Sequence, residues 1–195
     1  MNPTMVAADG SVLAPDVGSW FGSPTAEEDR ILERAEGPVL DIGCGPGRHA
    51  HALGQRGVPA LGVDVAHSAV ALARDRGVVA LQRSIFDPLP GAGRWRTALL
   101  LDGNIGIGGD PDRLLRRVRE LLRFDGGALV EVDPPDMRSS RTYARIEVGS
   151  SASAWFPWAR VSAGDLGELA IGTGYRLADL WSEGQRWFAG LRVAS

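Results

Sequence analysis

The run VLDIGCGPGRH, from Val39 to His49, combines an acid, Asp41, with Gly43, Gly45 and Gly47 at alternate positions. Glycine permits positive φ at little steric cost, so a buried strand can turn directly into a helix here. The missing side chains let a ligand lie against the main chain, with the first amides of the helix pointing at it. The pattern predicts a site for a nucleotide-like ligand with a carboxylate beside it.

The glycine spacing is not that of the dinucleotide fingerprint. That fingerprint is G-x-G-x-x-G, whereas this chain has D-x-G-x-G-x-G. A carboxylate at the edge of the site suits a cationic ligand better than a pyrophosphate. Asp64 ends the next predicted strand, in LGVDVA, where an acid can accept hydrogen bonds from a ribose diol.

Alternating strands and helices must position these residues. Predicted strands at 39–42, 59–63, 78–82, 96–101 and 126–132 alternate with predicted helices at 49–56, 67–76 and 111–123. This alternation implies parallel strands with right-handed crossovers. The strand-like runs 175–181 and 186–193 are joined by so short a loop that they must be antiparallel neighbours. Thr25 and Glu28 form a capping-box pattern, which predicts a further helix running on to Gly37.

The glycine turn, the two acids and the closing hairpin resemble the class I S-adenosylmethionine-dependent methyltransferases, over about residues 25–195. The resemblance implies a Rossmann-like α/β fold, with a seven-stranded mostly parallel sheet, an antiparallel C-terminal hairpin and helices on both faces. It implies S-adenosyl-L-methionine as cofactor and S-adenosyl-L-homocysteine as product. The N-P-P-[YF] tetrapeptide of methyltransferases that act on amino groups of DNA or protein is absent.

The resemblance also assigns residues to the cofactor. They are Asp41, Gly43, Cys44, Gly45, Gly47, Asp64, Val65, Ser84, Ile85 and Asp102. Asp41 is expected near the methionine end of the cofactor and Asp64 at its ribose hydroxyls. The family often has an acid beside the adenine amino group, where this chain has Ser84 and Ile85. An alignment that places Asp87 in that role is the alternative.

The sequence identifies no catalytic residue, and the candidates are Asp102, Asn104 and His49. A sulfonium donor is already activated, so methyl transfer needs mainly in-line positioning. A general base matters only for an acceptor that does not lose its proton easily. The candidates for acceptor contacts are Trp20, Asn104, Trp155 and Trp158. The alternative for the tryptophans of segment 134–164 is that they pack this insertion onto the sheet.

Bulk properties narrow the function further. The 195 residues suit one domain, predicted at 20–195 with a substrate-side insertion at 134–164, after a flexible N-terminal arm at 1–19. The net charge of −3 does not favour a nucleic-acid partner. All 21 basic residues are arginine, which excludes lysine Schiff-base chemistry and suggests a GC-rich bacterial genome. The single cysteine excludes an intrachain disulfide framework.

No apolar run is long enough to span a membrane and no secretory signal is recognisable, so a cytoplasmic location is expected. His49 and His51 do not share a helical face, and no metal site is predicted. The predicted function is methyl transfer from S-adenosylmethionine to a small molecule, with oxygen the first choice of acceptor atom and nitrogen or carbon open. The alternatives are a non-catalytic S-adenosylmethionine-binding sensor or subunit and, disfavoured by the glycine spacing, an NAD-dependent oxidoreductase. The oligomeric state is not predicted.

Overall fold

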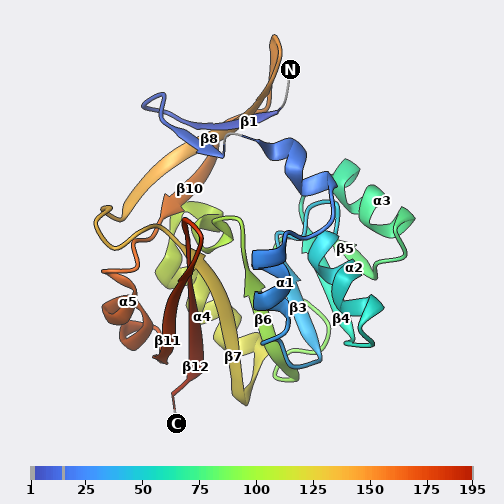
Figure 1. The fold of residues 1–195 in the computed structure, drawn as a ribbon, viewed down its shortest axis with the longest axis vertical. Helices are drawn as coiled ribbons and strands as arrows, with labels where there is room; N and C mark the ends of the chain where they lie inside the picture. The colour runs from blue at the N-terminus through green and yellow to red at the C-terminus, as the bar shows by residue number, and fades with distance from the viewer. Residues whose placement is uncertain (1–2, 15, 195) are drawn as a thin grey trace.

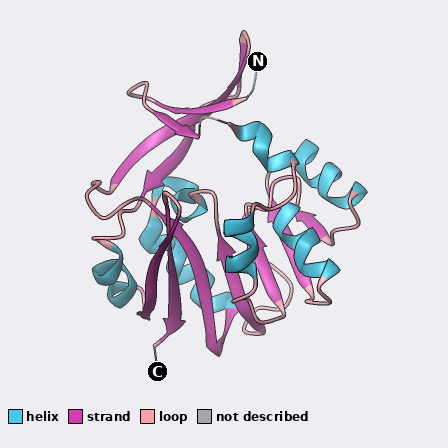
Figure 2. Ribbon diagram, in the orientation of Figure 1, coloured by secondary structure: helices cyan, strands magenta, loops and turns pink. Residues whose placement is uncertain are grey.

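The computed structural model describes residues 3–14 and 16–194 and arranges them as two sheets (Figures 1 and 2). The larger sheet consists of β3 (Val39–Ile42), β4 (Ala60–Asp64), β5 (Ala80–Gln82), β6 (Trp95–Leu100), β7 (Leu122–Val132), β11 (Tyr175–Glu183) and β12 (Arg186–Val193). Its order is β11-β12-β7-β6-β3-β4-β5. The strands β3 to β7 are parallel, and β12 is antiparallel to β7 and β11. The predicted fold class is therefore confirmed.

Helices cover both faces of this sheet (Figure 2). They are α1 (Ala26–Leu32), α2 (Arg48–Gln55), α3 (His67–Asp75), α4 (Pro111–Leu121) and α5 (Leu166–Gly172), with 3₁₀ helices η1 (Val17–Phe21) and η2 (Asn104–Gly109). Strand side chains alternate between the faces. Val39 belongs to the core with α1 and α2, whereas Leu40 belongs to the core with α4 and α5. Asp41, two residues after Val39, therefore faces the α1–α2 layer.

The predicted start of α1 is confirmed. The Thr25 hydroxyl accepts the Glu28 backbone N–H at 3.3 Å, and the Glu28 carboxylate accepts the Thr25 N–H at 3.0 Å. The predicted continuation to Gly37 is wrong, because the helix ends at Leu32. The Glu33 N–H still bonds the Asp29 carbonyl, but the amides of Arg34 and Ala35 each bond a carbonyl three residues back, which tightens the chain into a turn before β3.

The second sheet includes two strands from the segment 1–19, which was predicted to be a flexible arm; residues 1, 2 and 15 of that segment lie outside the described residues. Its strands are β1 (Thr4–Ala7), β2 (Val12–Ala14), β8 (Ser140–Val148), β9 (Ser151–Ala152) and β10 (Phe156–Arg160). β1 lies between β8 and β2 and is antiparallel to both. Met5 is 3% exposed in the small core of this sheet. The neighbouring strand β8 lies in segment 134–164, far along the chain, so no local pattern in the first residues reveals the pairing.

The second sheet lies above the carboxyl ends of the parallel strands (Figure 1). Glycines of η2 permit the close approach, since a Cβ on Gly106 would overlap the Ala159 carbonyl oxygen and one on Gly109 would lie 3.0 Å from the Pro157 Cβ. Arg160 of β10 also forms a bidentate ion pair with Asp133, with N–O distances of 2.7 and 2.8 Å. Backbone contact and this ion pair together fix the second sheet on the first.

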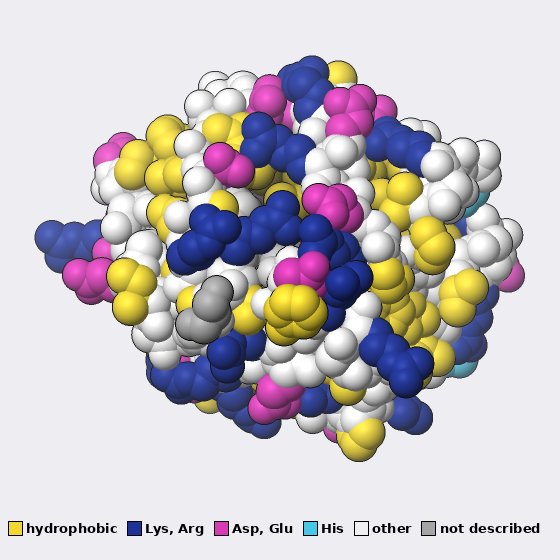
Figure 3. Space-filling view, turned by 90° about the horizontal axis from the view of Figure 1, so that it is seen from below, with side chains coloured by type: hydrophobic (Ala, Val, Ile, Leu, Met, Phe, Trp, Pro, Cys, Tyr) yellow, Lys and Arg dark blue, Asp and Glu magenta, His cyan; other side chains and the backbone are white. Residues whose placement is uncertain are grey.

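The opposite end of the molecule, at the amino ends of the parallel strands, carries a band of arginines with acidic side chains beside it (Figure 3). Arg96 pairs with both Glu36 and Asp125 there, and Arg123 also pairs with Asp125. Exposed pairs of this kind contribute about 1 kcal/mol or less each. No helix in the described part of the chain combines the length and hydropathy needed to cross a membrane.

Candidate functional site

The glycine turn between β3 and α2 has the expected left-handed backbone. Gly43, Gly45 and Gly47 have φ of 69°, 52° and 82°. A Cβ on Gly47 would lie 2.9 Å from the Ala73 Cβ, so this glycine is required for packing, whereas a Cβ on Gly45 would meet nothing within 4 Å. The Asp64 carboxylate accepts the Gly45 N–H at 2.9 Å and so ties the tip of β4 to the turn. The space over Gly45 is open to a ligand.

Asp41 is buried directly beneath this turn. Its side chain is 2% exposed, and its Oδ2 makes no hydrogen bond with any described residue. Burial raises the pKa of Asp41 to about 6, and the Asp102 carboxylate adds to the effect. His49 in its protonated form, a hydrogen bond from the Ala50 N–H and the Arg48 guanidinium offset part of it. A buried acid with an unpartnered oxygen is poised to gain from a nearby positive charge.

The other predicted cofactor residues are dispersed around the turn. Cys44 is buried against β4, and burial raises the pKa of its thiol, so it serves as a packing residue. Val65, following β4, is 68% exposed. The Ser84 hydroxyl accepts the Phe86 N–H, while the Ile85 side chain lies in the main core. Among these residues, only Val65 and Ser84 have side chains within reach of a ligand lying outside the core.

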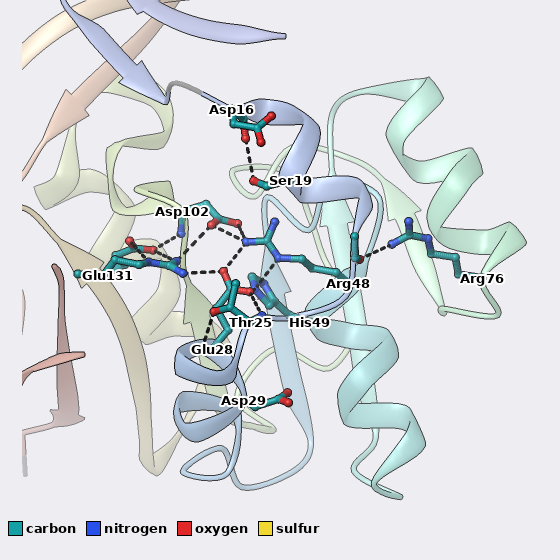
Figure 4. Close-up of polar contacts among 12 residues, drawn as sticks. Asp16, Ser19, Thr25, Glu28, Asp29, Arg48, His49, Arg76, Asp102 and Glu131 are labelled. Carbon is teal, nitrogen blue, oxygen red and sulfur yellow. Dashed lines mark hydrogen bonds and ion pairs between the residues drawn. The ribbon is translucent and has the colours of Figure 1, made fainter. Parts of the chain in front are cut away.

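An ion-pair network lies next to the turn, at the carboxyl ends of β6 and β7 (Figure 4). It consists of Glu28, Arg48, Asp102, Glu131 and Arg186. Nη2 of Arg48 bridges Glu28 at 2.6 Å and Asp102 at 2.7 Å. Arg186 donates to both oxygens of Glu131, at 2.8 and 2.7 Å, and to Glu28 at 2.8 Å. The network thereby joins α1, α2, β7, β12 and the end of β6.

The network is charged and largely buried. Burial alone would raise the pKa of Glu28, but His49 and Arg186 outweigh it and hold the pKa below its usual range. Burial opposes the charge of Arg186, yet Glu131 and Glu28 outweigh it and raise its pKa. Ligand-type atoms of Glu28, His49 and Asp102 lie within 4.8 Å of one another. Because the Arg48 guanidinium already bridges two of these acids, the arrangement is that of an ion-pair network and not of a metal centre.

The three catalytic candidates have different surroundings. Asp102 has φ of +56° and lines a cleft. Both of its carboxylate oxygens accept hydrogen bonds from Nη2 of Arg48. The Asn104 side chain donates to the carbonyls of Ile42 and Gly43 and is thereby committed to holding the glycine turn. His49 is buried and does not line the cleft. Of the three, only Asp102 lines the cleft.

The cleft has a volume of about 520 Å³ and lies between the second sheet, η1 and the ends of β6 and β7. Trp20 of η1 and Trp158 of β10 line it, together with Arg48 and Asp102. Trp155 does not line it and is 45% exposed, with the Arg145 guanidinium over its ring. Two of the three predicted tryptophans therefore lie at the cleft, and the third packs elsewhere.

Sequence reasoning missed the ion-pair network. Arg48 offered a signal, because a cation in the first turn of a helix opposes the helix dipole and needs an acidic partner. The sequence pattern identifies Glu28 only as a capping residue, through its Oε2. Its other oxygen, Oε1, accepts a hydrogen bond from Arg48. Glu131 and Arg186 lie on strands in no recognisable motif, and only the fold brings them to the network.

A model of the family described as "Methyltransferase domain" matches residues 39–126, which include the glycine turn, Asp64 and Asp102. A crystal structure of an S-adenosylmethionine-dependent methyltransferase from Bacteroides fragilis, in complex with S-adenosyl-L-homocysteine, is similar with a TM-score of 0.85 and 25% identity. That match covers 100% of this chain and 89% of the other. No curated protein matches the chain.

Two further solved structures share the fold at lower identity. One is the 1,6-didemethyltoxoflavin-N1-methyltransferase from Burkholderia thailandensis with bound 1,6-didemethyltoxoflavin and S-adenosylhomocysteine, with a TM-score of 0.65, 18% identity and coverage of 87% of this chain and 79% of that one. The other is a sugar N-methyltransferase from Streptoalloteichus, with a TM-score of 0.63, 18% identity and coverage of 91% and 90%. At this identity the likeness concerns the fold.

Proposed function

Because this chain belongs to the class I S-adenosylmethionine-dependent methyltransferases, we propose that it transfers the methyl group of its cofactor to a small molecule held in the cleft. The observation that carries the proposal is the position of Asp102. It accepts a hydrogen bond from Arg48, the residue that follows the glycine turn, and it also lines the cleft. Family membership leaves no place for the oxidoreductase alternative.

The residues present fit the cofactor. The open space over Gly45 admits a ligand against the main chain. The unpartnered Oδ2 of Asp41 provides negative charge below the turn, and Asp64 ends β4 where a ribose diol needs an acceptor. S-adenosylmethionine supplies a methyl group already activated on a sulfonium. The remaining task of the chain is to orient the acceptor and exclude water, which the cleft walls perform.

The cleft suits a small acceptor. Its volume of about 520 Å³ lies in the range typical of small-molecule sites, roughly 300–1,000 Å³. Trp20 and Trp158 offer flat apolar walls, and charged groups converge at its floor. The segment 134–164 supplies β10 and so forms the acceptor side in this proposal. Two of the structural neighbours are named for small-molecule methylation.

Two measurements test the proposal. Calorimetry with S-adenosylhomocysteine should give a micromolar-range dissociation constant. Incubation with methyl-labelled S-adenosylmethionine and a fractionated extract should place label in the metabolite fraction. Label found in protein or nucleic acid would contradict the small-molecule proposal, and binding with no transfer to any fraction would favour the sensor or subunit.

Replacing Asp64 with alanine should weaken S-adenosylhomocysteine binding on the order of 30- to 100-fold, or about 2–3 kcal/mol, by removing a charged acceptor. The change also frees the Gly45 N–H from its carboxylate partner. Asp75→Ala is the matched control, because Asp75 is exposed near α3's end with no hydrogen bond or ion pair to described residues. Unchanged affinity in Asp64→Ala would show that the ribose lies elsewhere.

Alanine at two positions of the turn should separate binding from stability. Gly45→Ala places a methyl in open space at positive φ, so we expect about 1 kcal/mol of destabilisation and at least tenfold weaker S-adenosylhomocysteine binding. Gly47→Ala forces a methyl against Ala73 and Val78, so we expect a larger loss of about 2–3 kcal/mol. Urea unfolding and calorimetry measure both. Wild-type affinity in Gly45→Ala contradicts a ligand lying on this turn.

A further inference from the structure

Arg48 has donors that the ion-pair network leaves unused. Its side chain is only 6% exposed. Nη2 bonds Glu28 and Asp102, and Nε donates to His49 at 3.1 Å. Nη1 is buried and has no hydrogen-bond partner among the described residues. Leaving a donor of a buried cation unsatisfied is unfavourable, so a partner for it is expected from outside the chain.

The unused end of Arg48 faces the cleft. Figure 4 shows the guanidinium with one side toward Asp102 and the other toward η1, where Ser19 lies. Arg48 and Ser19 both line the cleft, whereas the three glycines of the turn do not. The acids of the network already have partners. Glu28 and Asp102 accept hydrogen bonds from Nη2 of Arg48, and Glu131 accepts one from Arg186. The chain therefore holds a preformed cationic donor at the cleft floor.

We propose that Arg48 is an oxyanion receptor, whose Nη1 binds a carboxylate or equivalent anionic oxygen of a ligand in the cleft. The assignment rests on the proposed function and deepens it, because it requires the ligand in the cleft to carry an anionic oxygen. Nη1 carries two N–H donors and part of the guanidinium charge, and charge-assisted hydrogen bonds to a carboxylate oxygen are strong. With Glu28 and Asp102 holding Nη2, the group is oriented before the ligand arrives.

The anionic oxygen has two possible sources. The cofactor carries a carboxylate on its methionine end, and the acceptor is the other candidate. Two matched probe pairs distinguish them. S-adenosylhomocysteine and 5′-methylthioadenosine differ in the aminocarboxyl tail. Indole-3-carboxylate and indole-3-carboxamide, tested with saturating S-adenosylhomocysteine, differ in one negative charge and suit a cleft walled by Trp20 and Trp158.

The test compares Arg48→Lys with Arg186→Lys by calorimetry. Lysine keeps a positive charge for the acids of the network but lacks a further nitrogen that could bind a ligand while these acids are held. Arg186 is the matched control, because it shares Glu28 and Asp102 and its donors are taken by the network. Circular dichroism and thermal unfolding confirm that each variant is folded.

We expect the wild type to prefer the carboxylate-bearing member of at least one probe pair and Arg48→Lys to lose that preference at least tenfold. Arg186→Lys should keep it. Loss confined to the first pair assigns the oxygen to the cofactor, and loss in the second assigns it to the acceptor. The proposal is overturned if the wild type shows no preference, if Arg48→Lys retains it, or if Arg186→Lys loses it equally. Failure of the wild type to bind S-adenosylhomocysteine would instead refute the proposed function.

Discussion

Replacing Asp41 with asparagine is expected to raise the free energy of unfolding of the ligand-free protein by up to about 3 kcal/mol at neutral pH. Burial raises the pKa of this carboxyl from 3.8 to about 6, and each unit corresponds to about 1.4 kcal/mol. Between these two values the folded protein holds a proton that the unfolded chain has released. Stability therefore falls as pH rises through that window, and the full cost remains above it.

The asparagine carries no charge, so its advantage should disappear as the pH is lowered toward 4. Urea unfolding of both proteins at pH 4.5, 6 and 8 measures this convergence. The same variant should bind S-adenosylmethionine less tightly, because it lacks the negative charge that a cationic ligand stabilises. A stability difference that is equal at every pH, or tighter cofactor binding, would contradict this role for Asp41.

The Gly106→Ala variant is expected to lose about 3 kcal/mol of stability and most acceptor turnover. The added Cβ would overlap the Ala159 carbonyl oxygen and lie 3.0 Å from the carbonyl carbon and amide nitrogen of that residue. Backbone atoms cannot escape by rotating a side chain, so η2 or β10 must shift. Because β10 also carries Trp158, the shift deforms the cleft. S-adenosylhomocysteine affinity then shows whether the shift reaches the glycine turn, because Asn104 of η2 donates to the Ile42 and Gly43 carbonyls.

Gly54→Ala is the control for this prediction. Gly54 lies inside α2, and a Cβ there would meet nothing within 4 Å. Alanine should therefore stabilise the protein by up to about 1 kcal/mol through its higher helix propensity. Thermal unfolding and methyl-transfer assays compare the two variants. A Gly106→Ala protein with wild-type melting temperature and turnover would show that η2 and β10 are not held together by this contact.

Local signals predicted the larger sheet well. Asp41 and the glycines stand in one continuous run, so the sequence places them on a strand-to-helix turn without knowledge of the rest of the chain. Thr25 and Glu28 satisfied each other's backbone amides as the capping-box pattern predicts. The short link between β11 and β12 identified them as antiparallel. Each of these inferences depends on residues close together in the sequence.

The second sheet and the ion-pair network depend on distant residues instead. Met5 is buried only because β8 supplies a neighbouring strand. Arg186 meets Glu28 because β12 enters the sheet beside β7 and α1 packs across it. Trp155 and Trp158 lie close together in sequence, yet only Trp158, which is part of β10, lines the cleft, while Trp155 precedes the strand and is exposed. No spacing rule contains this information.

The pairing of β1 with β8 also sets an order of events during synthesis. Met5 lies opposite Ile146, so the central strand of the second sheet must wait until the ribosome has made the chain beyond β8. The strands β3 to β7 and their helices are complete in sequence before that point. Contacts between such distant segments form late and carry a large loop-closure cost. The part of the protein that carries the glycine turn can therefore assemble first, and the second sheet closes the cleft over it afterwards.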